Sequence, residues 1–459
     1  MGDHGIVWFR RDLRLEDNPA WAAATTRHDR VTALLVIETE LLLRAGPFRR
    51  QAFLDATREL DRQLAAIGGR LRVEHGDPAV LIPQIGSEMQ ASDVYVNGDV
   101  TRWSARRDAA VDGALRSPMR VSWGTVVHPP GSILTRAGTL SKVFTPFWKQ
   151  WSNQQTRPAA VPGSARIATA TGAGIPPGTS DSTPMTDNLE SLLQDIESYP
   201  ETRDLPAIAG TSRLSTALRF GTISPVHLVE LVGTDRPGAA AFVRQLAWRD
   251  WYAHTTAENL EIERKALRPG YDRIVWTTGE EADLDFTRWT NGMTGYPIVD
   301  AGMRELRSTG WMHNRVRMIA ASFLVKDLLI DWRRGERYFR HWLSDGDIPQ
   351  NAGNWQWVAG TGPDSAPYFR IFNPVTQSRR FDPTGAYIRQ WVPELSALSD
   401  NSIHEPWSLS PMERAAAGVW IDETYPAPII DHAFARERTL HAYQSALASQ
   451  IDPNEDKAP

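Results

Sequence analysis

Short apolar runs alternate with amphipathic stretches over the first 130 residues of the chain. Four runs rich in β-branched and aromatic residues have the length of buried strands: GIVWF at 5–9, VTALLVIE at 31–38, LRVEHG at 71–76 and DVYVNG at 93–98. Apolar residues recur at helical spacing over 47–69. Strand and helix alternation is typical of a parallel sheet covered on both faces. We therefore predict a doubly wound, Rossmann-like α/β domain over residues 1–130.

A linker and a helical domain are predicted after this α/β part. Residues 131–205 form the predicted linker, and the part from 157 to 184 is rich in Ala, Gly, Pro, Ser and Thr, as surface linkers are. The pattern over 206–450 is helical throughout, so we predict an all-α domain there. Residues 312–332 predict one long buried helix, and the tail after Gln450 is short and polar.

Composition and charge narrow the function classes. The chain has no cysteine, which excludes disulfides, thiolate metal sites and a cysteine nucleophile. A formal net charge of −5 argues against nonspecific coating of nucleic acid, although it says little about any one face. No apolar run approaches the roughly 20 residues of a spanning helix, and the N-terminus lacks the apolar core of a leader. We expect a cytoplasmic enzyme without membrane association.

One helix face and one acidic turn are candidates for ligand binding. Asn314, Arg317 and Met318 are three and four residues apart, so they share a face of a helix. A polar pair in an otherwise apolar helix needs partners, and Asp345 and Asp347 in the sequence SDGD supply acceptors. A DGD turn alone is more often an ordinary loop. The residues by themselves leave open whether this turn binds a ligand.

Long segments of the chain carry a resemblance to a known family. They are VWFRRDLRLEDNPA at 7–20, GTSRLSTALRFGTISP at 210–225, QLAWRDWYAH at 245–254, and the block that runs from TGYPIVDAGM at 294–303 through NWQWVAGTG at 354–362 to YFRIFNPVTQSRRFDPTGAYIRQWVPEL at 368–395. In order and spacing they resemble the photolyase/cryptochrome family, and within it the class I cyclobutane pyrimidine dimer photolyases. The resemblance covers most of the chain.

The resemblance implies a carbon–carbon lyase that repairs UV-damaged DNA with light. In the family, fully reduced FAD absorbs blue or near-ultraviolet light and donates an electron to a dimer flipped out of the duplex, the ring opens, and the electron returns. The expected partner is UV-damaged DNA, bound through backbone and lesion with weak sequence preference. From Arg304 to Arg340 nine Lys or Arg residues stand against four acidic ones, an excess that could follow the phosphates of one duplex, so we expect a monomer.

The resemblance also places a U-shaped FAD. It pairs Arg317 with Asp345, puts Asp347 close to the flavin and adenine, and turns Asn351 toward flavin N5. The other positions that match the cofactor site are Tyr199, Thr211, Ser212, Arg213, Leu214, Ser215, Arg249 and Asn314. Hydroxyl and backbone donors suit a pyrophosphate, although a TSxxS sequence alone is also an ordinary helix cap.

Three of the 18 tryptophans match the electron relay of the family. Trp355 would lie nearest the flavin, Trp332 in the middle and Trp276 at the outside. Indole rings are oxidisable, so a chain of them can return an electron to a photo-oxidised flavin. Most large aromatic residues at helical spacing belong to a core, and only the resemblance assigns this role.

Eight positions match residues that contact DNA or the lesion. They are Arg203, Gln245, Trp248, Arg249, Arg315, Met318, Trp357 and Arg370. Gln245 departs from the family pattern, because many class I enzymes have a Glu there that hydrogen-bonds the dimer. The resemblance nevertheless favours the cyclobutane dimer, because enzymes for (6-4) photoproducts carry His where this chain has Asn314 and Met318.

A second chromophore is expected in the α/β antenna domain. The sequence NGDVTRWSARRD at 97–108 resembles a deazaflavin-type site through Asp99, with Arg50 as a further candidate. Ser104 replaces the Glu expected for a folate antenna. We expect 8-hydroxy-deazaflavin, with methenyltetrahydrofolate as the alternative.

Two other functions remain open at this stage. A signalling cryptochrome has the same fold and flavin but transmits light to a protein partner, and such members usually have a long C-terminal extension. A (6-4) photolyase repairs the other major photoproduct. The 11 histidines are scattered, and no metal cluster or Ser-His-Asp arrangement is evident.

Overall fold

The computed structural model describes residues 3–178, 189–364 and 367–448. Residues 179–188 of the predicted linker and the predicted polar tail lie outside the described residues. The chain divides into two compact units. The sheet unit comprises Met1–Glu197, Ser212–Leu260 and Ser344–Gln350, and the helical unit comprises Ser198–Thr211, Glu261–Leu343 and Asn351–Pro459. The domain bounds at 130 and 205 stay predictions.

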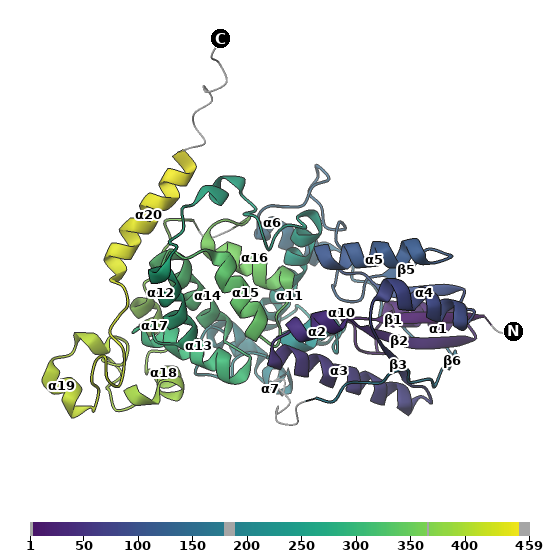
Figure 1. Cartoon of the computed structure of the whole chain (residues 1–459), viewed down its shortest axis with the longest axis horizontal. Coiled ribbons are helices and arrows are strands. Elements are labelled where there is room, and N and C mark those ends of the chain that lie inside the picture. The colour runs from purple at the N-terminus through teal and green to yellow at the C-terminus, as the bar shows by residue number, and fades with distance from the viewer. Residues whose placement is uncertain (1–2, 179–188, 365–366, 449–459) are drawn as a thin grey trace, which may run out of the picture. The chain divides into compact units, whose positions relative to one another are not determined.

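The sheet unit is built on a parallel β-sheet (Figure 1). The strand order is β3-β2-β1-β4-β5, and β6 pairs with the start of β2. The strands are β1 (His4–Phe9), β2 (Arg30–Ile37), β3 (Leu71–His75), β4 (Asp93–Asn97), β5 (Arg120–Ser122) and β6 (Arg166–Ile167). From β1 the sheet extends through β2 to β3 on one side and through β4 to β5 on the other. The strand order therefore reverses between β1 and β4, where open α/β sheets bind ligands.

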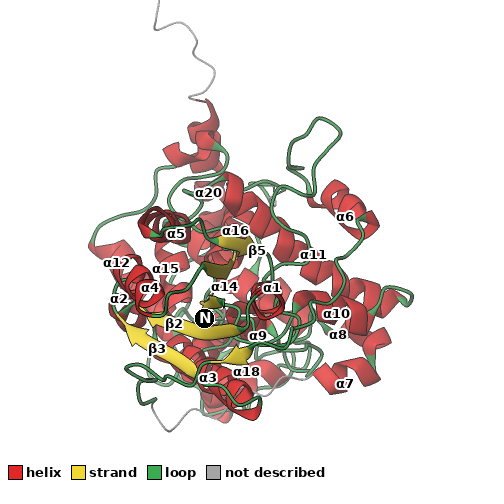
Figure 2. Cartoon of the chain, turned by 90° about the vertical axis from the view of Figure 1, so that its right-hand side faces the viewer, coloured by secondary structure: helices red, strands yellow, loops and turns green. Residues whose placement is uncertain are grey.

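Side chains of β1 alternate between two hydrophobic cores. Val7 and Phe9 pack with residues of α1 (Pro19–Arg27) and α3 (Pro47–Ala66). Ile6 and Trp8 pack with residues of α4 (Pro78–Glu88) and α5 (Arg102–Ala114). Helices thus cover both faces of the sheet, as Figure 2 shows. This arrangement confirms the predicted doubly wound α/β fold, because buried parallel strands are apolar on both faces.

Six further helices lie in the described residues of the sheet unit. They are α2 (Thr39–Arg44), α6 (Phe144–Asn153), α7 (Leu189–Gln194), α9 (Ser215–Phe220), α10 (Pro225–Val232) and α11 (Pro237–Glu258). The longest, α11, packs against α6 and α10. A short helix, η1 (Ile196–Ser198), and α16 (Ile348–Ala359) each begin in the sheet unit and end in the helical unit.

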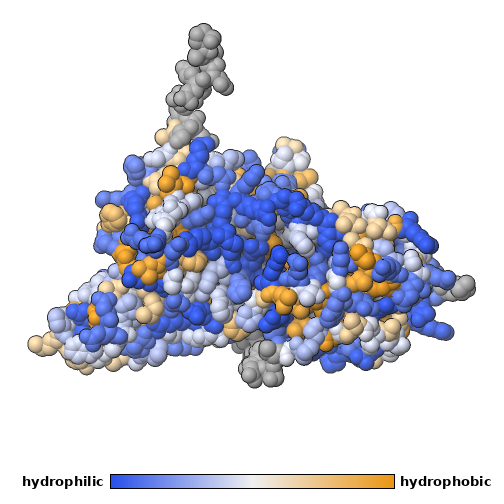
Figure 3. All heavy atoms as spheres, viewed as in Figure 1, coloured by the Kyte–Doolittle hydropathy of each residue, from blue (hydrophilic) through white to orange (hydrophobic). Residues whose placement is uncertain are grey.

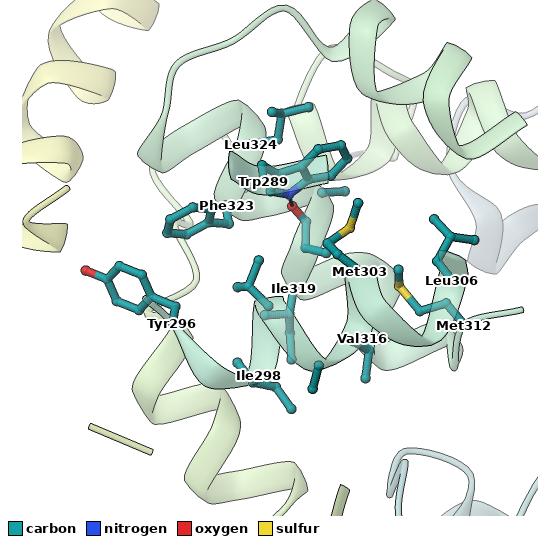
Figure 4. Close-up of a cluster of buried hydrophobic side chains, with 14 of the residues drawn as sticks. Trp289, Tyr296, Ile298, Met303, Leu306, Met312, Val316, Ile319, Phe323 and Leu324 are labelled. Carbon is teal, nitrogen blue, oxygen red and sulfur yellow. Dashed lines mark hydrogen bonds between the residues drawn. The ribbon is translucent and has the colours of Figure 1, made fainter. Parts of the chain in front are cut away.

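Apart from one isolated bridge between Ile421 and Tyr425, the regular secondary structure in the described part of the helical unit is helical, which confirms the predicted all-α character. Its helices are α8 (Tyr199–Thr202), η2 (Pro269–Arg273), α12 (Glu280–Asn291), α13 (Pro297–Thr309), α14 (Asn314–Ser322), η3 (Phe323–Asp327), α15 (Trp332–Trp342), α17 (Pro374–Phe381), α18 (Ala386–Trp391), η4 (Pro393–Leu395), η5 (Pro406–Ser408), α19 (Pro411–Ala416) and α20 (His432–Ala448). Figure 4 shows part of its core, in which Trp289, Met303 and Ile319 are buried.

The prediction of one helix over 312–332 is wrong. α14 ends at Ser322, a π-helical segment, η3, follows, and α15 begins only at Trp332. The buried Lys326 donates from Nζ to the carbonyl oxygen of Ala359 at 3.0 Å, and Leu329 has a φ of +54°. Periodicity could not reveal this break, because the segment is apolar on nearly all sides. A π-turn often marks a functional or strained position.

The surface is mainly hydrophilic where Figure 3 shows it, and hydrophobic residues form small separate groups there. Among the described residues, no helix combines the length and the apolar character that a bilayer span requires.

Candidate cofactor and DNA site

Buried ion pairs lie at the carboxyl ends of β1 and β4, where the strand order reverses. Arg11 follows β1, and its Nη1 lies 3.1 Å from Oδ1 of Asp99, which follows β4. The Nη2 atom of Arg11 lies 2.9 Å from Oδ1 of Asp347. Arg219 of α9 adds a longer contact of 3.7 Å from Nε to the same Asp347 oxygen. Asp347, a predicted cofactor residue, is therefore held by arginines of the sheet unit.

Electrostatics keep this array ionised. Burial alone would raise the pKa of Asp99, but the positive charges of Arg11 and Arg10 outweigh it and lower the pKa to about 2. Burial lowers the pKa of Arg219 to about 10, and repulsion by Arg11 adds to this. A small cavity beside the array is lined in part by Arg11, Asp99, Thr125, Arg249, Asp347 and Gln350.

The α11 face with Gln245 and Trp248 lies on the sheet unit. Trp248 is half-buried and stacks on Phe144 of α6, with ring centroids 3.7 Å apart and planes 14° apart. Gln245, three residues earlier, donates from Nε2 to the carbonyl oxygen of Ala241 at 3.1 Å. This leaves its side-chain oxygen for another donor. Arg249 donates to the carbonyl oxygen of Leu218 at 3.1 Å.

In the helical unit, α14 turns its polar face away from the core. Asn314 is exposed, and Arg317 and Met318 are half-buried. Val316 and Ile319 point into the hydrophobic core, as Figure 4 shows. The Nε of Arg317 donates to the carbonyl oxygen of Met312 at 2.7 Å, and Asn314 Nδ2 lies 3.8 Å from the sulfur of Met318. The structure thus brings these three predicted residues onto one face.

The side chain of Asn351 is fixed by Glu336. Its Nδ2 donates to the backbone oxygen of Glu336 at 2.9 Å and to the carboxylate Oε1 at 3.0 Å. Glu336 is fully buried, and burial raises its pKa against the charge of Arg340. Arg340 lies 3.2 Å from Glu336 and 2.9 Å from Glu263. Glu336 could not be predicted from the sequence, because its helix is rich in arginine, which suggests a solvated ion pair.

The three predicted relay tryptophans lie in the helical unit. Trp355 is buried and meets Trp289 and Phe339 edge-on, with centroid distances of 6.3 and 5.0 Å. Trp332 is fully buried at the start of α15, where Asp331 caps the helix. Trp276 is half-buried and meets Tyr443 edge-on at 6.2 Å.

Two of the residues predicted to contact DNA, Arg315 and Arg203, contact other side chains of the helical unit. The Nη2 of Arg315 lies 2.7 Å from Asp204, and its guanidinium lies 4.3 Å above the Phe381 ring. Arg203 lies 5.8 Å above the ring of the buried Tyr199. The helical unit also holds a half-buried Trp357, a half-buried Thr211 and an exposed Arg370.

The remaining predicted positions belong to the sheet unit. Ser212 is half-buried, Arg213 and Ser215 are exposed, and Leu214 is buried at the start of α9; Asp345 lies at the edge of burial and Arg50 is half-buried on α3. Among the residues that the structure describes, no three His, Asp or Glu side chains gather as a metal site would require.

Comparisons with known proteins agree with this architecture. Residues 5–164 match the family model described as DNA photolyase, and residues 242–445 match the FAD binding domain of DNA photolyase. The deoxyribodipyrimidine photo-lyase of Escherichia coli K12 is 37% identical over 96% of this chain and 98% of its own length. The chain therefore belongs to the DNA photolyase family, and its second matched segment is the FAD-binding domain of that family.

Two solved structures are similar over nearly the whole chain. A bacterial class III photolyase from Agrobacterium tumefaciens has a TM-score of 0.87 at 36% identity, with 97% of this chain and 98% of that chain covered. A cryptochrome from Synechocystis sp. PCC6803 has a TM-score of 0.86 at 29% identity, with 96% and 99% covered. A photolyase and a cryptochrome thus share this fold.

Proposed function

We propose that the chain is a deoxyribodipyrimidine photo-lyase that uses light to split cyclobutane pyrimidine dimers in UV-damaged DNA. The observation that carries the proposal is the match to photo-lyases over almost the full length of both chains. The assignment to class I stays a prediction from the sequence. A DNA duplex with one lesion is the proposed partner, and the protein is proposed to act as a cytoplasmic monomer.

The donor set of the helical unit suits a flavin. Reduced FAD, when bound, supplies the electron that opens the dimer ring. Asn351 uses both N–H groups of its amide on Glu336, so its Oδ1 is the atom that can accept a hydrogen bond. An acceptor opposite flavin N5 favours a flavin that carries a proton there. Asn351, held by a buried partner, would therefore favour the reduced state that repair needs.

The α11 face suits a flipped pyrimidine dimer. Trp248 is held rigid by the Phe144 stack, so an aromatic surface is present to replace the base stacking that the lesion loses. Gln245 Nε2, on the same helix face, uses one N–H on Ala241, and its second N–H can donate to a thymine carbonyl. The amide orients the dimer but supplies no proton. Asn314 and Met318 favour the cyclobutane dimer over the (6-4) photoproduct.

We propose 8-hydroxy-deazaflavin as the antenna and methenyltetrahydrofolate as the alternative. Ser104 supports the first, because it is buried at the start of α5 and its hydroxyl donates to the carbonyl oxygen of Thr101 at 2.8 Å. It offers no carboxylate to a folate. Asp99 is ionised but paired with Arg11, so its charge is already compensated inside the protein. Arg50 is the second proposed antenna residue. Absorption titration of the apoprotein with each chromophore distinguishes them.

A blue-light receptor is the second candidate, and the similarity to the Synechocystis cryptochrome favours it. Expression of the chain in bacteria that lack photoreactivation can distinguish DNA repair from light reception. Cells that express the chain should survive ultraviolet irradiation better when blue light follows than when darkness follows. Equal survival in light and dark, with flavin bound to the protein, would contradict the repair function and favour the receptor.

A further inference from the structure

The stretch Ser344–Gln350, which contains the predicted flavin-site aspartates, is attached to the sheet unit by side chains. The contacts are Thr216 Oγ1 with Ser344 Oγ at 2.9 Å, Arg219 Nε with the Gly346 oxygen at 3.3 Å, Arg49 Nη1 with the same oxygen at 3.5 Å, and Gln350 Nε2 with the Arg249 oxygen at 2.9 Å. The contact at Asp347 differs from these, because it joins two buried charges.

We propose that Arg11 is a positioning residue for the cofactor site, because it fixes the carboxylate of Asp347 by bridging it to Asp99. The two terminal nitrogens of one guanidinium reach the two carboxylates at 2.9 and 3.1 Å. A planar guanidinium is suited to such a bridge, and a lysine ammonium is a single point charge. The inference rests on the proposed cofactor site, to which Asp347 belongs.

Burial makes the loss of one partner of this bridge costly. The side chains of Arg11, Asp99 and Asp347 are 11%, 13% and 5% exposed. A buried charge that loses its partner is costly, so the stretch with Asp347 should move or admit water when Arg11 is neutralised. Arg219 is farther from Asp347, at 3.7 Å, and replaces the lost contact incompletely. The position of Asp347 therefore depends mainly on a residue in the turn after β1.

The adjacent Arg10 provides a matched control. Its Nη1 lies 2.6 and 2.5 Å from the two carboxylate oxygens of Asp108, and its side chain is 7% exposed. Arg10 is thus as buried and as well paired as Arg11, in the same turn, but its partner lies on α5. Loss of Arg10 disturbs the sheet unit to a similar degree without touching Asp347.

The experiment compares Arg11→Gln with Arg10→Gln. FAD binding to apoprotein is measured by flavin fluorescence, and the absorption spectrum and reduction potential of bound flavin are recorded. Arg11→Gln should raise the dissociation constant of FAD by about 10- to 100-fold, as loss of a supporting residue does at metal sites, and should shift the flavin spectrum. Arg10→Gln should leave both near the wild-type values.

Two more variants keep the proposal testable if Arg11→Gln fails to fold. Arg11→Lys, which keeps the charge but not the bridge, should bind FAD with intermediate affinity. Asp99→Asn, which keeps the Arg11–Asp347 contact, should weaken FAD less than Arg11→Lys does. Equal losses in the Arg10 and Arg11 variants, or wild-type FAD affinity and spectrum in Arg11→Gln, would overturn the proposal. Failure of the wild-type chain to bind FAD would instead refute the proposed cofactor site.

Discussion

Gly335 of α15 lies directly against the indole of Trp355. Substitution of Gly335 by alanine therefore tests how tightly the core of the helical unit is packed at this point. A Cβ added at Gly335 would lie 2.2 Å from Cη2 of Trp355 and 2.5 Å from Cδ2 of Leu324. Non-bonded carbons prefer separations of about 3.5–4.0 Å. In Gly335→Ala, Trp355 or the helix must therefore shift by about 1.3 Å relative to the other, in a core where Trp355 and Leu324 are both buried.

Two opposing terms set the magnitude of the effect. Alanine in place of a helical glycine favours folding by about 1 kcal/mol. Overpacking of a filled core costs about 1–3 kcal/mol, and sometimes more. A clash with two immobile side chains belongs at the upper end of that range, so we expect Gly335→Ala to destabilise the protein by about 2 kcal/mol. Gly86→Ala in α4 is the control, because nothing lies within 4 Å of the added Cβ.

Thermal unfolding, followed by circular dichroism, measures both variants. Gly335→Ala should lower the midpoint by about 4–8 °C, at roughly 2–4 °C for each kcal/mol in a unit of 150–250 residues. Gly86→Ala should leave it unchanged or raise it. The displaced Trp355 should also slow photoreduction of oxidised flavin in Gly335→Ala only. A variant as stable as the wild type, with normal photoreduction, would refute the packing of α15 against Trp355.

Three further predictions concern the relay, the lesion and pH. Trp332→Phe should abolish photoreduction of oxidised flavin and spare repair by chemically reduced enzyme; normal photoreduction in the absorption assay would show that the relay is misassigned. Gln245→Glu should keep or raise cyclobutane dimer repair in a turnover assay, and complete loss would contradict the placement of Gln245. Burial raises the pKa of Asp250 from 3.8 to about 6, so its carboxyl binds more protons in the folded state. Its contribution to stability should therefore fall as pH rises from about 4 to 6. Asp250→Asn should make the melting midpoint depend less on pH over that range, and a pH dependence equal to that of the wild type would contradict the raised pKa.

The fold of the sheet unit was largely predictable because the strands at the centre of its sheet are buried on both faces. Such strands appear as nearly continuous apolar runs, and β1, β2 and β4 correspond to three of the predicted ones. The fourth, β3, stands at the end of the strand order and alternates between buried and half-buried residues over most of its length. β5 and β6 span three and two residues, too few to show a pattern. The break between α14 and α15 was missed because a segment that is apolar on nearly all sides has no hydrophobic periodicity that could reveal a π-helical turn.

The candidate site was predictable only where local sequence carries the family pattern. Asn314, Arg317 and Met318 share a face because helix geometry dictates it. Arg11 received no role, because its partner Asp347 lies far along the chain and only the fold joins them. Glu336 was missed for a related reason: its burial against Asn351 depends on the packing of α15 with α16.

Repair of DNA with one defined thymine cyclobutane dimer tests the central claim most directly. Chemically reduced, flavin-loaded protein is given this substrate under blue light, with a dark control and a (6-4) substrate in parallel, and restored thymines are quantified by chromatography. We predict restored thymines from the cyclobutane dimer in the light alone. Repair of neither lesion by flavin-loaded protein would contradict the account, and repair of the (6-4) lesion alone would overturn the substrate assignment.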